Sequence, residues 1–474
     1  MVNFGAVRNF CVAALFLLSG GNFFVTCTPK FLHIDNHSSK MNKILKYAAL
    51  FAAITLITGC ALVGRSKSDD NAQEGSIISN GSEQLALMYN PYSTTIHPKV
   101  FAKKHNLEDI ELYVIINDAE LLFSKANAQK SNTAMVKIFY KVMESYEKTA
   151  LIDSCTRTVN FTKEASSKTY AIKLKLKPQE LKKFVIQTTV TDLLRGKMSI
   201  HFTEIDKTDP FSEDNYMATQ IKNMQPLAEH YIKKGDAVRI DYLCTSKYPA
   251  LMSGNKSHEL TIPLSPYSSD PAVEDTTIFY NTTEKNASYI LRGDTAQLYA
   301  STADTNYNRN YVLPCFDGDF PNIDTPEEMM LPLAYLATPE EFDALRHATA
   351  KKLAVDDFWY SCTHDIRKAK ELIKVYYTRA IISNVLFTDY RKGMLTDRGM
   401  VYIILGPPRM LAITSSAEVW TYRDSKSGQK IRFVFRRTRT KLSGEKYVLR
   451  RSTEFKTVWD RAVGSWRKGN IFTF

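Results

Sequence analysis

Cysteine is scarce in this sequence, with seven residues among 474, which excludes a disulfide-dense mini-protein. No run of 18 apolar residues follows Cys60, so no transmembrane helix is expected beyond that point. The signatures GxSxG, HExxH, Walker A and a GxGxxG between a strand and a helix are all missing. The nine His do not stand at metal-ligand spacing from another His, a Cys or a carboxylate. We therefore expect no metal site, no cofactor and no recognisable catalytic residue.

Two acidic groups come nearest to a reactive site. Asp356-Asp357 with His364-Asp365 could serve as an acid–base cluster, but they flank Phe358-Trp359 and are typical of a helix start over a core aromatic. Asp317-Gly318-Asp319 and Asp324 are rich in oxygen but lack the spacing and the closing Glu of an EF-hand. We interpret them as an acidic turn, with a loose calcium contact as the alternative.

Apolar residues and positive charge are what the chain does have. It is 44% hydrophobic, with 62 Lys+Arg against 50 Asp+Glu and a net charge of +12. This composition excludes a disordered tail, and the length indicates about three domains. The charge points to nucleic acid, anionic lipid or another polyanionic surface as partner classes.

The amino-terminal region resembles a bacterial lipoprotein signal. Met41 and two lysines precede the apolar run 47–58, and Gly59-Cys60 follows it, which is the pattern of a secretory signal peptide. Residues 57–60 (Ile-Thr-Gly-Cys) resemble the lipobox, in which the cysteine is lipidated and cleavage occurs before it. The alternative is a signal anchor with an unrelated cysteine, or a buried helix. Several acyl chains on Cys60 would hold the protein on a membrane without a spanning helix.

This resemblance predicts the organisation of the first 84 residues. We expect 1–40 to be an upstream extension without a structural role, 41–59 to be the signal peptide and 60–84 to be a flexible tether, because it is rich in Ser, Asn, Gly and charge. Ala61 is compatible with sorting to the outer membrane, on either its periplasmic or its surface side. Export excludes cytoplasmic nucleic acid. The remaining partners are the membrane through the lipid, envelope proteins, and anionic glycans or lipids.

Short alternating segments predict two β-sandwiches of immunoglobulin type, at 85–210 and 211–325. The expected strands of the first are 110–116, 134–142, 169–176, 184–190 and 198–202. Those of the second are 237–242, 258–264, 277–280, 288–292 and 296–300. With the helical segment and the terminal domain described below, the expected fold class is α+β, mainly β.

The pattern becomes helical in 326–392. Thr325-Pro326 and Thr338-Pro339 are each followed by Glu at the capping-box position and should each begin a helix. Apolar residues from Ile366 to Val385 recur at three- and four-residue spacing, which predicts a long amphipathic helix. Arg379 falls on the polar side of this helix, where we expect a solvated charge.

The last region, 393–474, carries the most specific motif. Gly393-Met394-Leu395-Thr396-Asp397, the apolar run 400–405 and Glu418-Val419-Trp420 resemble the GWxTD domain, with Met394 in place of the tryptophan. The resemblance extends from about 326 to 460. It implies an exported bacterial protein, often a lipoprotein, with an α+β terminal domain, and it implies no biochemical activity. No role that is specific to the tryptophan indole is expected here.

The motif also has a physical interpretation. Its glycines indicate a positive φ or a close backbone approach, and Thr396 and Asp397 are suited to accept hydrogen bonds from nearby N–H groups. Arg398 could pair with Asp397 or with another carboxylate. The run 400–405 should be a buried strand that Gly406 ends. The motif is therefore either structural or a binding site, and its candidate residues are Gly393, Thr396, Asp397, Arg398, Gly399 and Gly406.

Positive charge gathers in the same region. Residues 391–474 hold 19 Lys+Arg against 6 Asp+Glu, a net charge of +13, whereas the chain from Cys60 onward carries +8. Alternation should place some arginines on the outer face of strands. Such a basic patch suits lipid phosphates, anionic glycans or an acidic protein. Its expected members are Arg432, Arg436, Arg437, Arg439, Arg450 and Arg451.

Four cysteines after Cys60, at 155, 244, 315 and 362, permit three disulfide pairings or free buried thiols. Taken together, these features predict an outer-membrane lipoprotein of the GWxTD type that is a noncatalytic binding or assembly component of the cell envelope. The alternative is an enzyme that acts on an envelope polymer, with a site near Thr396 and Asp397.

Overall fold

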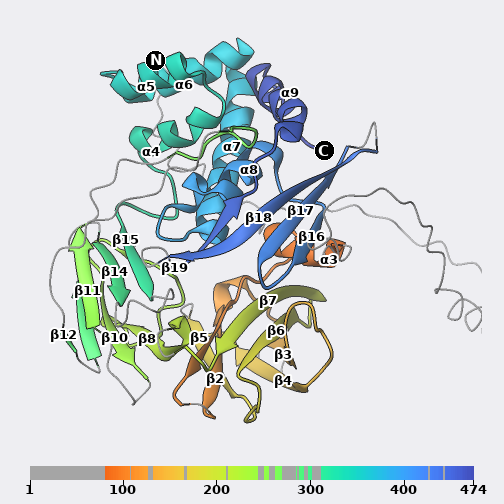
Figure 1. Cartoon of the computed structure of the whole chain (residues 1–474), viewed down its shortest axis with the longest axis vertical. Helices are drawn as coiled ribbons and strands as arrows, with labels where there is room; N and C mark the ends of the chain where they lie inside the picture. Colours follow the sequence, from red (N-terminus) through yellow and green to blue (C-terminus); the bar gives the residue numbers. More distant parts are fainter. Residues whose placement is uncertain are drawn as a thin grey trace, which may run out of the picture. The chain divides into compact units, whose positions relative to one another are not determined.

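The computed structural model describes residues 81–474 apart from 107, 126–131, 165–167, 210–211, 244–249, 256–261, 270–283, 286–287, 293–296, 302–310, 425–427 and 441–443. All of these described residues belong to one unit, Ile77–Phe474. Its antiparallel sheets and helices make an α+β chain that is mainly β, as expected (Figure 1). Cys60 and the expected segments 1–40 and 41–59 lie outside the described residues. Within the described part of the chain, no helix has the length and apolar character needed to cross a membrane.

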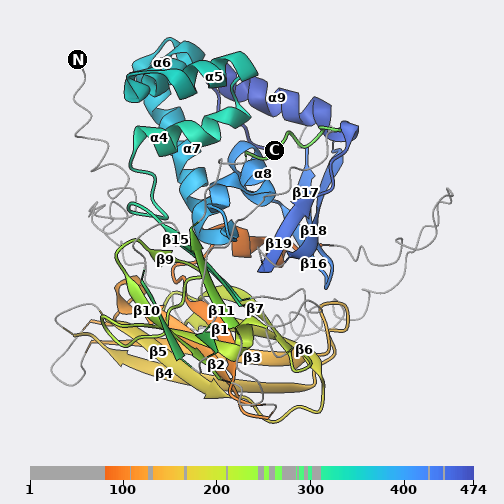
Figure 2. The same cartoon turned by 60° about the vertical axis from the view of Figure 1, so that its left-hand side comes forward.

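Residues 99–206 form two antiparallel sheets around one core. The first sheet has the order β1-β2-β5, with β1 (Lys99–Lys104), β2 (Ile110–Asn117) and β5 (Thr169–Lys175). The second has the order β4-β3-β6-β7, with β4 (Asp153–Thr162), β3 (Thr133–Met143), β6 (Lys183–Asp192) and β7 (Lys197–Asp206). Val114 of the first sheet and Ile138 and Ile186 of the second are fully buried in the same cluster. The two sheets therefore enclose a shared core (Figure 2).

The five strands predicted in this region all exist, but the sequence does not predict β1 and β4. Strand β4 exposes most of its side chains, because it lies at the edge of its sheet and pairs only with β3. Its sequence therefore lacks the alternation of apolar and polar residues that signals a strand. Two short 3₁₀ turns, η2 (Asp118–Glu120) and η3 (Glu213–Asn215), complete this part of the chain.

Two further sheets follow. One has the order β13-β10-β8, with β13 (Ser288–Arg292), β10 (Ala237–Tyr242) and β8 (Tyr216–Gln220). The other has the order β12-β11-β14-β15-β9, with β12 (Glu284–Lys285), β11 (Ala250–Asn255), β14 (Gln297–Ser301), β15 (Val312–Phe316) and β9 (Ile232–Lys233). Strands β15 and β9 are parallel. Tyr216, Ile240 and Leu313 share a smaller core.

The strand predictions for this second region are partly correct. Strands β10 and β13 have the predicted bounds, and β14 differs from its prediction by one residue at each end. The strand expected at 258–264 is wrong for 262–264, which lie in no strand. Residues 258–261 and the strand expected at 277–280 lie outside the described residues.

The helical segment begins as its capping signals predict. Its elements are α4 (Pro326–Met330), η4 (Leu331–Tyr335), α5 (Pro339–His347), α6 (Lys351–Thr363) and α7 (Ile366–Phe387). The Thr325 side chain accepts a hydrogen bond from the Glu328 backbone at the start of α4. Thr338 and Glu341 form a complete capping box at the start of α5. The long predicted helix is α7, which ends two residues beyond the predicted Val385.

The C-terminal region packs helices against a four-stranded antiparallel sheet (Figures 1 and 2). The strands are β16 (Met410–Ile413), β17 (Ala417–Arg423), β18 (Lys430–Thr440) and β19 (Gly444–Leu449), in that order. The other elements are η5 (Gly393–Leu395), α8 (Asp397–Leu405), η6 (Thr453–Phe455) and α9 (Lys456–Arg467). Tyr376 of α7, Trp420 of β17 and Trp466 of α9 are fully buried in one core.

The run 400–405 is a helix, so the prediction of a buried strand is wrong. A short continuous apolar run fits a buried helix as well as a buried strand. Here Thr396 caps the helix, and every residue from Gly399 to Leu405 is buried in α8. Gly406 ends the element, as expected, with a φ of 83° that favours glycine.

The end of the predicted tether is structured. Ser82 pairs with Leu411 of β16 through two backbone hydrogen bonds of 2.9 and 3.1 Å. The helix α3 (Glu83–Ala86) and the turn η1 (Leu87–Tyr89) follow, and Ala86 and Tyr89 are buried in the C-terminal core. Residues 81–89, which we call the N-terminal strap, therefore belong to the C-terminal region and not to a tether or to the first β region. The segment pairs with the edge of β16 and packs in the C-terminal core, and its polar composition does not predict these contacts.

Candidate functional site

The two glycines of the motif permit close backbone approach. A Cβ atom on Gly393 would lie 1.9 Å from the carbonyl oxygen of Ser383 in α7, and a Cβ on Gly399 would lie 1.9 Å from the carbonyl oxygen of Gly393. Neither glycine has a positive φ. Of the two interpretations of the motif glycines, close approach is therefore correct, and any side chain at either position would push α7, η5 and α8 apart.

Thr396 joins the turn to the helix that follows it. Its Oγ1 accepts a hydrogen bond from the Gly399 backbone N–H at 3.0 Å and donates one to the Gly393 carbonyl at 2.8 Å. The first bond satisfies an otherwise unpaired N–H of the first turn of α8. Thr396 is 3% exposed, so both of these bonds are shielded from water.

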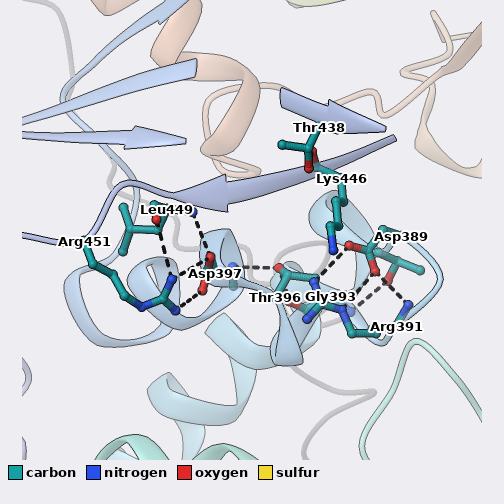
Figure 3. A network of polar contacts seen from close by, with 11 residues as sticks. Asp389, Arg391, Gly393, Thr396, Asp397, Thr438, Lys446, Leu449 and Arg451 are labelled. Carbon is teal, nitrogen blue, oxygen red and sulfur yellow. Dashed lines mark hydrogen bonds and ion pairs between the residues drawn. The ribbon is translucent and has the colours of Figure 1, made fainter. Parts of the chain in front are cut away.

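Asp397 connects α8 to the sheet. Its Oδ2 accepts a hydrogen bond from the Leu449 backbone N–H at 2.8 Å, and its Oδ1 lies 2.7 Å from Nη2 of Arg451 (Figure 3). The carboxylate also lies in the first turn of α8, where the helix dipole favours a negative charge. Sequence reasoning expected a nearby N–H group as partner, whereas the partners are 52 and 54 residues away.

Arg398 pairs with a carboxylate other than Asp397. Its Nη1 lies 3.0 Å from Oε1 of Glu418 in β17, and its guanidinium lies 3.9 Å from the ring centre of Tyr447. Burial opposes the charge, but the Glu418 carboxylate raises the pKa of Arg398 above its ordinary value. Arg398 therefore keeps its charge inside the protein.

The same Glu418 carboxylate accepts hydrogen bonds from two more residues. Tyr89 of the N-terminal strap donates its hydroxyl to Glu418, and Trp420 donates its indole N–H at 3.1 Å. Burial and the neighbouring carboxylate raise the pKa of Tyr89 well above its ordinary value, so this hydroxyl stays protonated and donates. We call Tyr89, Arg398, Glu418 and Trp420 the Glu418 cluster. The sequence gives no signal for Tyr89, because it stands more than 300 residues before its partners.

Met394, which replaces the family tryptophan, is fully buried. Its backbone N–H donates to Asn384 Oδ1 at 2.9 Å, and its carbonyl accepts the hydroxyl of Tyr335 at 2.7 Å. The position therefore serves the core, where a flexible thioether fills the space.

The carboxyl end of α8 is held by a charge that was expected to be solvated. Arg379 of α7 donates to the carbonyls of Ile403 and Ile404 at 3.1 and 3.2 Å, where a cation satisfies unpaired carbonyls and the helix dipole. The prediction of a solvated Arg379 is therefore wrong. Tyr422 adds a hydrogen bond to the carbonyl of Gly406 at 2.8 Å.

The six arginines of the expected basic patch do not form one surface. Arg451 binds Asp397, and Arg437 pairs with Glu204 of β7 and, at 2.5 Å, with Glu445. These two are partly buried structural charges. The side chain of Arg439 lies outside the described residues, whereas three members of the patch are exposed, namely Arg432, Arg436 and Arg450.

The other acidic candidates have ordinary structural partners. Asp356 pairs with Lys352 at 2.5 Å, and Asp365 caps α7 by accepting from the N–H groups of Arg367 and Lys368. Asp317 and Asp319 lie 3.3 and 3.8 Å from Lys234 and Lys233, respectively. In the described part of the chain, no group of His, Cys, Asp and Glu is arranged to hold a metal ion.

The cysteines contribute no disulfide among the described residues. Cys155, Cys315 and Cys362 are not joined in disulfides, and Cys244 lies outside the described residues. Cys315 and Cys362 fit the alternative of buried thiols, whereas Cys155 is exposed on β4.

Comparison with known proteins identifies the C-terminal region. Residues 297–468 match the GWxTD domain family, so the chain contains a GWxTD domain that begins at β14, upstream of the expected limit near 326. No curated protein matches the chain. Among solved structures, it is similar to the β-glucuronidase of Bacteroides uniformis at 11% identity and a TM-score of 0.15, over 29% of this chain and 16% of that chain. A likeness this small carries no argument about fold or function.

Proposed function

We propose that this protein is a lipid-anchored lipoprotein of the bacterial outer membrane that binds or assembles other envelope components without catalysing a reaction. The Ile-Thr-Gly-Cys sequence at 57–60 supports the anchor, and the GWxTD domain at 297–468 supports the protein class. The partners that fit an exported basic protein are envelope proteins or anionic glycans and lipids.

One observation carries the noncatalytic assignment. The polar groups of the motif are buried and bind other parts of the same chain: Thr396 is 3% and Asp397 8% exposed, and each has the partners described above. A catalytic residue must reach a substrate, whereas Asp397 is occupied by Arg451 and by a backbone N–H group. The motif therefore serves to hold α7, α8 and the sheet together.

The β regions supply the binding surfaces in this proposal. We infer that 99–206 is a sandwich of immunoglobulin type, because three strands in the order β1-β2-β5 face four in the order β4-β3-β6-β7. The second β region is proposed to be a related sandwich. Such sandwiches are common in proteins of cell surfaces, where their strand faces and loops bind partners.

The anchor is tested by replacing Cys60. A Cys60→Ala protein should lose incorporation of a labelled fatty acid and should leave the membrane fraction, because the thiol that forms the lipid bond is gone. Cys155→Ala is the matched control, since Cys155 is an exposed free thiol and should keep both properties. Unchanged labelling of the Cys60→Ala protein would refute the anchor.

The binding role is tested by crosslinking intact cells. The wild-type protein should recover defined envelope partners, and an Asp397→Asn protein should lose them only to the extent that it loses stability. The alternative enzyme predicts turnover of a purified envelope polymer that a folded Asp397→Asn protein no longer shows. That result, or recovery of no partner at all, would refute the proposal.

A further inference from the structure

One face of the C-terminal sheet carries several cations. None of the described strand residues that the pairing register places on this face is a carboxylate. Directly opposite residues of neighbouring strands share a face, and so do alternate residues along a strand. Arg423 lies opposite Lys430, Thr421 opposite Arg432, and Ala417 opposite Arg436. Arg450 follows on the same side, two residues after Val448, which lies opposite Arg436. We call these cations the basic sheet face: Arg423, Lys430, Arg432, Arg436 and Arg450.

The other described positions of this face include one further cation, Lys446, which lies opposite Thr438. The neutral ones are Met410, Ala412, Ala417, Val419, Thr421, Val434, Thr438 and Val448. Val419 and Thr421 are buried, and the stems of long basic side chains can lie over such positions while their charged ends stay in water. The exposed cations therefore stand among mostly apolar positions on this face.

Arginines on the two sides of the sheet differ in their surroundings. Inward Arg437 and Arg451 are ion-paired with Glu445 and Asp397, respectively. The five cations of the basic sheet face are all exposed. Burial therefore distinguishes the two sides of the sheet: the inward arginines are partly buried, and the cations of the basic sheet face are exposed.

The chain that leads to the anchor joins this same sheet. Ser82 of the N-terminal strap pairs with Leu411 of β16, the edge strand of the sheet. The chain from Cys60 to Ser82 can span at most about 75 Å when fully extended. A lipid on Cys60 would therefore keep the basic sheet face close to one membrane and raise its local concentration there. This step rests on the proposed lipid anchor.

We propose that the basic sheet face binds the anionic phospholipid headgroups of the membrane that holds Cys60. Guanidinium groups form paired hydrogen bonds with phosphate oxygens, and clusters of cations next to a membrane anchor bind anionic leaflets. The face is then a second attachment that orients the GWxTD domain on the membrane.

The experiment uses the full chain with Cys60→Ala, which cannot be acylated at that position. Vesicles of phosphatidylcholine with phosphatidylglycerol are compared with vesicles of phosphatidylcholine alone in a flotation assay. The test variant combines Arg423→Glu, Lys430→Glu and Arg432→Glu. The matched control combines Arg367→Glu, Lys370→Glu and Lys374→Glu, which change the net charge equally on exposed positions of α7.

The full chain should bind the anionic vesicles more strongly than those of phosphatidylcholine alone, and it should dissociate from the anionic vesicles at high salt. The test variant should bind at least about a hundredfold more weakly, because each of its three lost cations contributes about fivefold to affinity near an anionic surface. The control should bind as the parent does. All variants share the same amino-terminal segment, so the difference between them reports the sheet face alone. If the test variant does not fold, Lys430→Gln with Arg432→Gln replaces it, with about a 25-fold loss expected from two cations.

Unchanged vesicle binding by the test variant, or an equal loss in the control, would overturn the proposal. Binding of the full chain to soluble polyglutamate but not to anionic vesicles would overturn it in favour of an acidic protein partner. Because no acyl chain is present in this assay, its failure leaves the anchor proposal intact. Failure of fatty-acid labelling at Cys60 would remove the anchor and leave the vesicle result to stand alone.

Discussion

The hydroxyl group of Tyr89 lies 2.8 and 2.9 Å from the two carboxylate oxygens of Glu418, although 329 residues separate them in the chain. The carbonyl of Tyr89 accepts the hydroxyl of Tyr402 at 2.8 Å, and its ring lies 5.1 Å from that of Phe387. The N-terminal strap thus completes the interior of the GWxTD domain. A fragment restricted to 297–468 would leave Glu418 without one of its donors.

A Tyr89→Phe protein should be less stable by about 1–3 kcal/mol, because a buried carboxylate loses a donor while the ring packing is kept. Denaturant unfolding at neutral pH measures this change. Tyr92→Phe is the matched control, since Tyr92 is 74% exposed and the change should have little effect. Equal stability of the Tyr89→Phe protein and the parent would show that the contact contributes no net stability.

An Asp397→Asn protein should lose about 3–5 kcal/mol, because Arg451 would keep a partly buried charge without its partner. Asp460→Asn in α9 breaks an exposed ion pair with Lys456 and should cost less than about 1 kcal/mol. A double-mutant cycle with Arg451→Met measures the coupling. Additive effects of Asp397→Asn and Arg451→Met would contradict a direct ion pair.

Gly393→Ala should prevent correct packing and cost more than about 4 kcal/mol, because the added methyl group would overlap the Ser383 carbonyl of α7. Gly464→Ala in α9 meets no atom within 4 Å and should raise stability by about 0.5–1 kcal/mol through helix propensity. Thermal unfolding of both proteins checks the pair. If the Gly393→Ala protein unfolds at the same temperature as the parent, α7 and η5 can move apart with little loss of stability.

The stability of the first β region should depend on pH through His201. Burial, with smaller effects from Lys99 and His97, lowers the pKa of His201 to about 4. Between the ordinary histidine pKa of about 6.5 and this value, the unfolded chain binds a proton that the folded protein does not bind. Stability should therefore fall as the pH decreases through this window, and this contribution should level off below about pH 4.

A His201→Gln protein tests this dependence. It should lose less stability between pH 7 and pH 5 than the parent, as measured by urea unfolding at both values. His364→Gln, at an exposed position, should follow the parent. If all three proteins show the same pH dependence, His201 is not the titrating group.

Local signals in the sequence predicted local structure well. The capping box of Thr338 and Glu341 depends only on residues three positions apart, and it exists as expected. Most strands predicted in the first β region alternate apolar and polar residues because one face of each packs on the core. Strand β2 is instead a mostly apolar run that is buried on both faces. Strand β4 gave no such signal, since an exposed edge strand does not need apolar residues.

The candidate site was predicted in part. Thr396 has the nearby N–H partner that its chemistry requires. The partners of Asp397 and Arg398 were not predictable, because Arg451 and Glu418 approach them only when α8 packs on the sheet. The helical state of 400–405 was not predicted for a different reason. Every residue of this run is buried, so no alternation with polar residues shows whether its period is that of a helix or of a strand.

Residue types and their local spacing were sufficient for the fold class, the helix starts, the stop at Gly406, the GWxTD motif and the concentration of positive charge near the carboxyl end. Those features depend on bonds between near neighbours and on the periodicity of burial. Tertiary packing decided which arginines are buried and paired, which face the solvent, and that the N-terminal strap belongs to the GWxTD domain. Such contacts join residues that are 52 and 329 positions apart in the chain, and no local sequence pattern predicts contacts at such separations.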